Sequence, residues 1–193
     1  SSAASDVYKR QGETCMSDKN RTGSTTGFTI RPMREEDLQI VGEMTATTFT
    51  PYEDPNSPYL DILRDVTPRF QNADANFVAV DDVTDQILGA VTLAAGGNPW
   101  ASIAQEGEIE LRTLAVDEAA QGRGIGSTLV RTCQEYAVQN GFHTVVLSTR
   151  ENMVPAHRVY ERMGFQLERS RFWSPVPGLI VRCYVWPVPT ATR

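Results

Sequence analysis

The sequence predicts one mixed α/β domain of ordinary size. Its 193 residues are enough to bury a core without disulfides or metals, and its 40% hydrophobic and 22% charged residues are typical of a globular chain. Short apolar or alternating segments, typical of strands, are interspersed with segments that have apolar residues at helical spacing. Glycines and prolines separate these segments, and the predicted order is β-α-α-β-β-β-α-β-α-β-β without an internal repeat.

The first half of the domain is predicted to contain three strands and two helices. Residues 38–49 are predicted to be helical because their apolar residues share one face and three acidic residues crowd the first turn. A loop with three prolines, residues 51–58, follows this helix. The predicted elements are a strand at 28–32, helices at 38–49 and from 59, and strands at 77–80 and 87–93.

The second half is predicted to contain four strands and two helices. Residues 122–140 have a clear 3.6-residue period that Gly141 closes. Pro155 is placed in the first turn of the next helix, which Gly164 ends. The predicted elements are a strand at 108–116, a helix at 122–140, a strand at 145–147, a helix from 155 to 163, and strands at 165–173 and 179–186.

Charge and composition exclude several classes of function. The 18 basic and 24 acidic residues give a net charge of −6, which is unfavourable for binding a phosphate backbone and favours cationic small molecules. The sequence contains no run of 18 apolar residues, so it predicts no membrane-spanning helix. The three cysteines and two histidines are scattered, so we expect no metal site and reduced thiols in a cytoplasmic protein.

The two ends of the chain are expected to lie outside the domain, which we place at residues 28–187. Residues 1–27 are predicted to be a disordered tail, since they are polar and have no apolar period. Residues 6–11 resemble the translation of a transposase adapter used in shotgun sequencing libraries, which predicts a non-native scar and a natural start at Met16. Residues 188–193 are predicted to be a C-terminal tail.

The segment from Glu110 to Gly126, ELRTLAVDEAAQGRGIG, is predicted to bind a phosphate. A strand leads into a glycine-rich turn at residues 121–126, and the turn begins an amphipathic helix whose first N–H groups lack partners. A purely structural turn is the alternative. A dinucleotide-binding loop is disfavoured because its fingerprint has a glycine three residues after the second glycine, where this chain has Ser127. A Walker loop is disfavoured because its Gly-Lys-Ser/Thr ending is absent.

Two motifs in register resemble the GCN5-related N-acetyltransferase (GNAT) superfamily. The first is Gln-x-x-Gly-x-Gly after the Leu-Ala-Val end of a strand, and the second is Asn152-x3-Ala156-x3-Tyr160-x3-Gly164-Phe165. The resemblance implies a mostly antiparallel central sheet with helices on both faces. It also implies an acetyl-CoA-dependent N-acyltransferase that acts directly on an amine in a ternary complex.

The resemblance places the acetyl-CoA site along the strand, the glycine turn and the next helix. In the family the strand at 108–116 splays from the strand at 145–148, and the cofactor enters the gap. For Arg123, the alternative to contact with the phosphates is an exposed, solvated side chain. For Asn152, the alternative to contact with the cofactor is a helix N-cap. The implied cofactor-binding residues are Leu114, Ala115, Val116, Gln121, Gly122, Arg123, Gly124, Ile125, Gly126, Ser127, Asn152 and Ala156.

Two side chains are candidates for the chemistry. The resemblance implies Glu110 as the base that deprotonates the amine, although a structural pair of Arg112 with Glu110 or Glu108 is the alternative. Strand alternation predicts that Glu110, Arg112, Leu114 and Val116 share one side. Tyr160 is the implied acid for the leaving thiolate, and a packing role is its alternative.

The acceptor is predicted to be an amine on a small molecule or a protein. The resemblance places its site near the first helices and the last strands, where aromatic and acidic residues suit a cation. A non-catalytic acyl-CoA-binding module remains the alternative function, and the resemblance is compatible with a homodimer. The candidate acceptor residues are Phe49, Tyr52, Glu53, Asp54, Tyr59, Trp173 and the turn 174–177.

Overall fold

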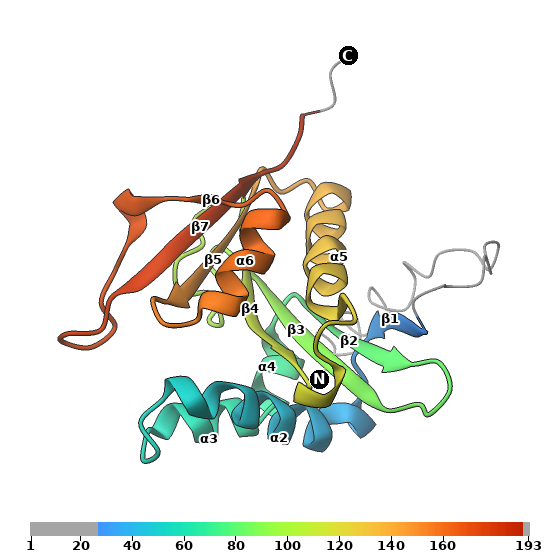
Figure 1. Cartoon of the computed structure of the whole chain (residues 1–193). Helices are drawn as coiled ribbons and strands as arrows, with labels where there is room; N and C mark the ends of the chain where they lie inside the picture. The colour runs from blue at the N-terminus through green and yellow to red at the C-terminus, as the bar shows by residue number, and fades with distance from the viewer. Residues whose placement is uncertain (1–26, 191–193) are drawn as a thin grey trace, which may run out of the picture.

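The computed structural model describes residues 27–190. Its strands form one seven-stranded sheet in the order β1-β2-β3-β4-β5-β7-β6 (Figure 1). Neighbouring strands are antiparallel except for β4 and β5, which are parallel. The predicted mixed, mostly antiparallel fold is therefore confirmed. The strands are β1 Phe28–Pro32, β2 Ala75–Asp81, β3 Ile87–Ala95, β4 Glu108–Val116, β5 Thr144–Arg150, β6 Gln166–Leu167 and β7 Val181–Pro187.

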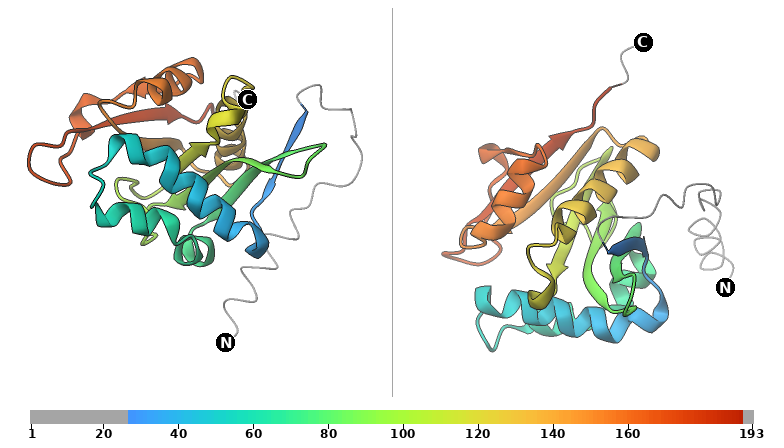
Figure 2. Two further views of the ribbon diagram at one scale, coloured as in Figure 1. Left: turned by 60° about the horizontal axis from the view of Figure 1, so that its bottom comes forward. Right: turned by 45° about the vertical axis from the view of Figure 1, so that its right-hand side comes forward.

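Helices cover both faces of the sheet (Figures 1 and 2). Helices α5 and α6 pack on one face, where Leu129 and Leu111 belong to one hydrophobic cluster. Helix α2 packs on the other face, where Val41 and Ala115 belong to a second cluster. No described helix is both long and apolar enough to cross a membrane. The helices are α2 Leu38–Phe49, α3 Pro58–Arg64, α4 Thr67–Asn72, α5 Ile125–Gln139 and α6 Val154–Arg162, with 3-10 turns η1 Glu35–Asp37, η2 Thr50–Tyr52, η3 Glu118–Ala120 and η4 Arg169–Arg171.

The element order differs from the prediction in two places. A third helix, α4, follows α3, and its six residues contain too few apolar side chains to give a period. The predicted strand at 165–173 is reduced to β6, because the chain turns into η4 where Glu168 accepts a hydrogen bond from the backbone N–H of Ser170. The predicted scar at 6–11 lies outside the described residues.

Candidate functional site

Strands β4 and β5 pair along only part of their length. Their parallel register runs from Glu108 opposite Thr144 to Leu111 opposite Leu147. Beyond that point β5 continues to pair with β7, and β4 with β3, so the two strands diverge. The backbone of β4 after Leu111 is therefore free on its β5 side and can pair with an extended ligand.

A bulge in β4 changes the face to which its side chains point. Arg112 lies opposite Thr92 and Ala115 opposite Ala90, so two residues of β4 face one of β3, and Thr113 has a φ of 51°. Leu114 and Val116 consequently pack with the α5 side of the sheet, whereas Ala115 packs with α2. The prediction that Glu110, Arg112, Leu114 and Val116 share one side is wrong, because the extra residue shifts the alternation.

The glycine turn before α5 needs glycine for its backbone conformation. Gly122 and Gly124 have φ values of 82° and 80°, and Gly124 is the N-cap of α5. A Cβ at either position would meet no atom within 4 Å. The first helical bond here runs from Thr128 N–H to the Gly124 carbonyl, so the preceding N–H groups are available to an anion.

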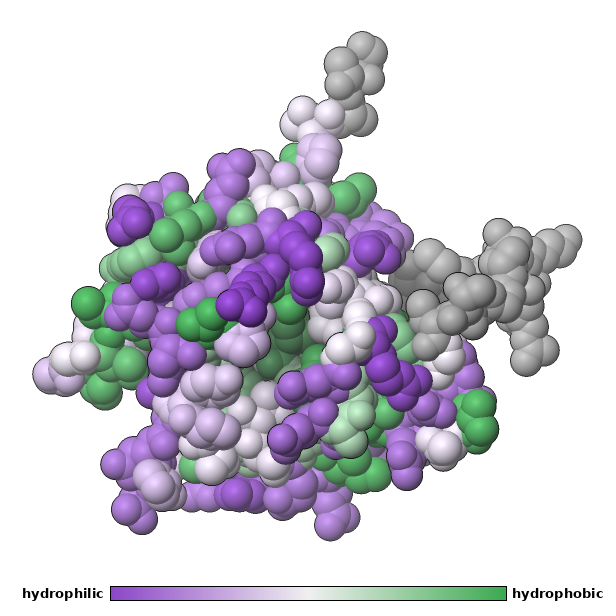
Figure 3. Space-filling view, viewed as in Figure 1, coloured by the Kyte–Doolittle hydropathy of each residue, from purple (hydrophilic) through white to green (hydrophobic). Residues whose placement is uncertain are grey.

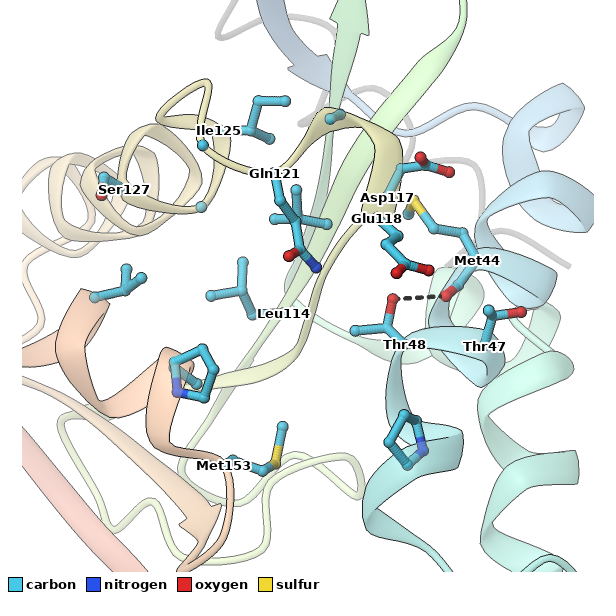
Figure 4. A pocket seen from close by; sticks show the side chains of 18 of the residues that line it. Met44, Thr47, Thr48, Leu114, Asp117, Glu118, Gln121, Ile125, Ser127 and Met153 are labelled. Carbon is cyan, nitrogen blue, oxygen red and sulfur yellow. Dashed lines mark hydrogen bonds between the residues drawn. The ribbon is translucent and has the colours of Figure 1, made fainter.

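The free edge of β4 and the glycine turn open into one cleft of about 1260 Å³. Hydrophobic side chains lie in the depth of this hollowed face and hydrophilic ones around it (Figure 3). Leu114 and Gln121 point into the cleft, and Met44 and Thr48 face them from α2 (Figure 4). The lining comes from α2 and η2 (Gln39, Ile40, Glu43, Met44, Thr47, Thr48, Pro51, Tyr52), from β4 to α5 (Leu114, Val116, Asp117, Glu118, Ala120, Gln121, Gly122, Gly124, Ile125, Gly126, Ser127) and from the start and face of α6 (Met153, Pro155, Ala156, Val159, Arg162).

Nine of the predicted cofactor residues line this cleft, and Ala115, Arg123 and Asn152 do not. Ala115 is buried on the α2 face. Arg123 donates to Asp81 at 3.1 Å and to the carbonyl of Gly27. Asn152 is exposed, and the N-cap of α6 is Met153, so the alternative role of Asn152 as that cap is not realised.

Sequence reasoning missed Arg162, which lines the cleft from α6. The helical period could have revealed it, because Arg162 stands three residues after Val159 and six after Ala156, and therefore shares one face of the helix with them. The polar residues with which α2 lines the cleft belong to no recognisable sequence motif: Gln39, Glu43, Thr47 and Thr48.

Glu110 is fully buried, does not line the cleft and holds the loop that precedes β4. Its Oε2 accepts hydrogen bonds from the backbone N–H groups of Ser102, Ile103 and Ala104 at 2.7, 2.8 and 3.2 Å. Its Oε1 lies 3.6 Å from Nε of Arg112. These contacts correspond to the structural alternative for Glu110, and Glu108 pairs with Arg171 rather than with Arg112.

Tyr160 lies on the buried side of α6, within the core, and does not line the cleft. Its ring lies against those of Phe165 and Tyr184, with centroids 6.0 and 6.1 Å apart. Burial raises the pKa of its phenol, and the neighbouring Cys133 and Tyr184 raise it further. The phenol therefore keeps its proton throughout the neutral range.

Of the predicted acceptor residues, only Tyr52 lines the cleft. Phe49 and Tyr59 pack edge to face at 6.5 Å. Glu53 forms an ion pair with Arg150, whose Nη1 also donates to the Tyr52 carbonyl at 2.8 Å. This pair ties the segment after α2 to the end of β5.

The other predicted acceptor residues lie away from the cleft. Asp54 accepts a hydrogen bond from the backbone N–H of Asn56. Trp173 is 37% exposed, pairs with Val181 and precedes the exposed turn 174–177.

Comparison with protein families identifies the family to which the chain belongs. The family model described as "Acetyltransferase (GNAT) family" matches residues 38–165, which include β4, the glycine turn and α6. The chain belongs to this family.

Curated relatives match parts of the chain. N-acetylaspartate synthetase of Xenopus tropicalis is 35% identical over 94 residues, or 49% of this chain and 32% of the relative. Human N-acetyltransferase 8B is 26% identical over 145 residues, or 71% of this chain and 63% of the relative. The chain thus spans less than two thirds of the length of either relative.

Solved structures share the fold. A GNAT-family acetyltransferase of Staphylococcus aureus Mu50 superposes with a TM-score of 0.67 at 16% identity, covering 84% of this chain and 99% of that one. The yncA acetyltransferase of Salmonella typhimurium, solved with acetyl-CoA, gives 0.63 at 16% identity, covering 86% and 97%. Spermidine N-acetyltransferase of Vibrio cholerae, solved with CoA and spermine, gives 0.61 at 19% identity, covering 84% and 96%.

Proposed function

We propose that this protein is an N-acetyltransferase that binds acetyl-CoA in the cleft and transfers the acetyl group directly to an amine. One observation carries the proposal: the free edge of β4 and the N-terminus of α5 open into the same cleft. An amide-bearing arm joined to a pyrophosphate requires both features. The acetyl-CoA complex of the yncA acetyltransferase supports this assignment.

Each part of the ligand has partners in the cleft. The backbone of Leu114 and Val116 pairs with the amide-bearing arm, and the N–H groups of residues 122–127 bind the pyrophosphate. Arg162 adds positive charge at the cleft, a role that the sequence had assigned to Arg123. Contacts from Ala115, Arg123 and Asn152 stay predictions of the resemblance.

The transfer forms a C–N bond, breaks a C–S bond and leaves a thiolate that needs a proton. The backbone N–H of Val116 is the proposed donor to the carbonyl oxygen as its charge develops. Tyr160 as the proton donor stays a prediction of the resemblance, and burial, which raises the pKa of its phenol, makes it a weaker acid than an exposed tyrosine. Glu110 as the base stays a prediction, and its contacts with residues 102–104 favour the structural role.

A non-catalytic acyl-CoA-binding module is the second candidate. It is favoured by one observation: neither Glu110 nor Tyr160 lines the cleft. The two candidates share the cofactor site and differ in turnover.

Thiol release from acetyl-CoA distinguishes them. The protein is mixed with acetyl-CoA and a panel of primary amines, with an amine-free reaction as the control for hydrolysis. Amine-dependent release is the expected result. Binding of acetyl-CoA without release by any amine would support the module, and absence of binding would contradict both candidates.

A further inference from the structure

Met153 lines the cleft, whereas its neighbour Asn152, to which the sequence motif assigned the cofactor contact, does not. Asn152 is exposed, and Met153 is only 9% exposed. The start of α6 therefore brings an apolar side chain to the cleft at the point where the motif predicts an amide. An apolar side chain shapes the space that a ligand occupies, and neither the proposed cofactor contacts nor the proposed chemistry uses this one.

The proposed binding mode gives the cleft an acyl end. The pyrophosphate binds at the glycine turn, and the free backbone of β4 runs from there back toward Leu111, its last residue paired with β5. An arm that pairs with the backbone of Leu114 and Val116 therefore carries its thioester on the side of Leu114 away from the turn. In Figure 4 Leu114 lies between Gln121 of the turn and Met153. Met153 thus stands at the acyl end.

The backbone of Met153 is fixed to the end of β5. Its N–H donates to the carbonyl of Arg150 at 3.1 Å, and its own carbonyl accepts from the N–H groups of Ala156 and His157 at 3.1 and 3.2 Å. Nε2 of His157 lies 2.9 Å from the same Arg150 carbonyl. Met153 is also the N-cap of α6. Its side chain consequently has a defined position along the cleft.

Arg150 also bridges the two walls of the cleft at this end. Its Nη1 donates to the carbonyl of Tyr52 at 2.8 Å, and its Nη2 forms an ion pair with the largely buried Glu53. The bridge joins the segment after α2, which lines one wall through Tyr52, to the end of β5, which holds Met153 on the other. An acyl group that extends past the thioester therefore enters a bounded space.

We propose that Met153 sets the length of the acyl group that the cleft accepts, so that acetyl is transferred and butyryl is discriminated against. The inference rests on the proposed acyl transfer, in which the same C–N bond forms and the same C–S bond breaks whatever the acyl length. Added methylenes in a filled apolar site are unfavourable, because they force neighbouring side chains from their preferred rotamers. Shortening Met153 removes atoms beyond its Cβ and frees room for the longer chain.

Binding of acyl-CoA compounds of different length tests the inference without any mutation. The Kd of the wild-type protein is measured by calorimetry for CoA, acetyl-CoA, propionyl-CoA and butyryl-CoA. We expect the Kd for butyryl-CoA to exceed that for acetyl-CoA by about tenfold or more, the usual effect of a changed methylene count in a fitted apolar site. An equal or lower Kd for butyryl-CoA would overturn the inference.

Two methionines at opposite ends of α6 give a matched pair of variants. Met153→Ala is expected to lower the ratio of the Kd for butyryl-CoA to that for acetyl-CoA by about tenfold. Met163→Ala is the control, because Met163 is the half-buried C-cap of the same helix and does not line the cleft. An unchanged ratio in Met153→Ala, or an equal fall in Met163→Ala, would overturn the inference.

Met153→Val keeps the test decisive if Met153→Ala does not fold. It shortens the side chain with a smaller loss of buried apolar surface, and it is expected to lower the ratio of the Kd for propionyl-CoA to that for acetyl-CoA. An unchanged ratio in the folded Val variant would contradict the role of Met153.

Thiol release with the same compounds separates this inference from the proposed function. It is measured with the amine that gives the highest rate with acetyl-CoA, and kcat/KM is expected to fall with acyl length as binding does. Failure to bind CoA and every acyl-CoA would contradict the proposed function. Binding and release that are independent of acyl length would contradict the role of Met153 alone, whereas length-dependent binding without release would support that role in a non-catalytic module.

Discussion

Glu110 and Leu114 belong to the same strand but face opposite sides of the sheet, because the bulge at Thr113 shifts the alternation between them. Glu110 is buried against the loop at 102–104, and Leu114 lines the cleft. The strand thus separates a carboxylate that holds a loop from the backbone proposed to hold acetyl-CoA. Substitutions at the two positions are therefore expected to change different properties.

Glu110→Gln tests whether this carboxylate is a base or a structural residue. The variant weakens the charge-assisted bonds to three backbone N–H groups, so we expect the free energy of unfolding to fall by about 1–3 kcal/mol. Because the side chain lies outside the cleft, the pH profile of kcat should keep its shape. The measurements are chemical denaturation and the pH dependence of turnover. A displaced acid limb with unchanged stability would instead make Glu110 the base.

Gly124→Val is expected to abolish acetyl-CoA binding. Both Gly124, with a φ of 80°, and Gly141, with a φ of 74°, adopt the left-handed conformation, and a Cβ at either would meet no atom within 4 Å. Gly141→Val is therefore a matched control with a similar strain of about 1–2 kcal/mol. Only Gly124→Val should remove the increase in Tm that acetyl-CoA produces. Retained binding in Gly124→Val would show that the glycine turn does not hold the ligand.

The sequence predicted Arg123 as the cation that meets the phosphates, whereas Arg162 lines the cleft in the structure. The variants Arg162→Ala and Arg123→Ala test which of the two contributes to binding. Arg162 lines the cleft, whereas Arg123 is paired with Asp81. Removing an exposed charge partner costs roughly 0.2–1 kcal/mol, so Arg162→Ala should raise the Kd for acetyl-CoA by up to about fivefold, and less at high salt. Calorimetry at two ionic strengths checks this. A larger effect of Arg123→Ala would reverse the assignment.

Tyr160→Phe is expected to lower kcat without changing the Kd for acetyl-CoA. Loss of a general acid reduces turnover by about 10²–10⁴-fold. Tyr184→Phe is the matched control, because Tyr184 is a buried neighbour whose phenol also has a raised pKa and is given no catalytic role. Steady-state kinetics with both variants decide, and an unchanged kcat in Tyr160→Phe would leave this ring a packing role only.

The raised pKa of Tyr160 also predicts a dependence of stability on pH. Because the folded protein favours the neutral phenol, the stabilisation is complete below the ordinary pKa of about 10 and is lost as the pH rises above it. Between pH 9 and 11, Tm should therefore fall more steeply in the wild-type protein than in Tyr160→Phe. Parallel curves would mean that the phenol ionises equally easily in both states.

The fold could be predicted from the sequence because each long element carries its own period. The helix around Leu129 and the strand ending at Val116 show spacings that depend only on neighbouring residues. Helix α4 was missed because its six residues contain a single large apolar side chain, Phe70, which packs against the hydrophobic cluster on that face of the sheet.

The site could be predicted only where backbone requirements leave a motif. Gly122 and Gly124 are visible in the sequence because their positive φ demands glycine. The bulge at Thr113 is invisible, since a non-glycine residue occupies the strained position, and the strand alternation therefore failed there. The pairing of Arg123 with Asp81 joins residues 42 positions apart, which no local pattern reveals.

The most direct test of the account is the change in Tm on adding acetyl-CoA, CoA or NAD to the wild-type protein. A ligand at about 100 times its Kd adds about 2.7 kcal/mol to the free energy of unfolding. We predict a clear increase in Tm with acetyl-CoA and CoA, and none with NAD. An unchanged Tm with both CoA compounds, or an increase with NAD alone, would contradict the assignment of the cleft.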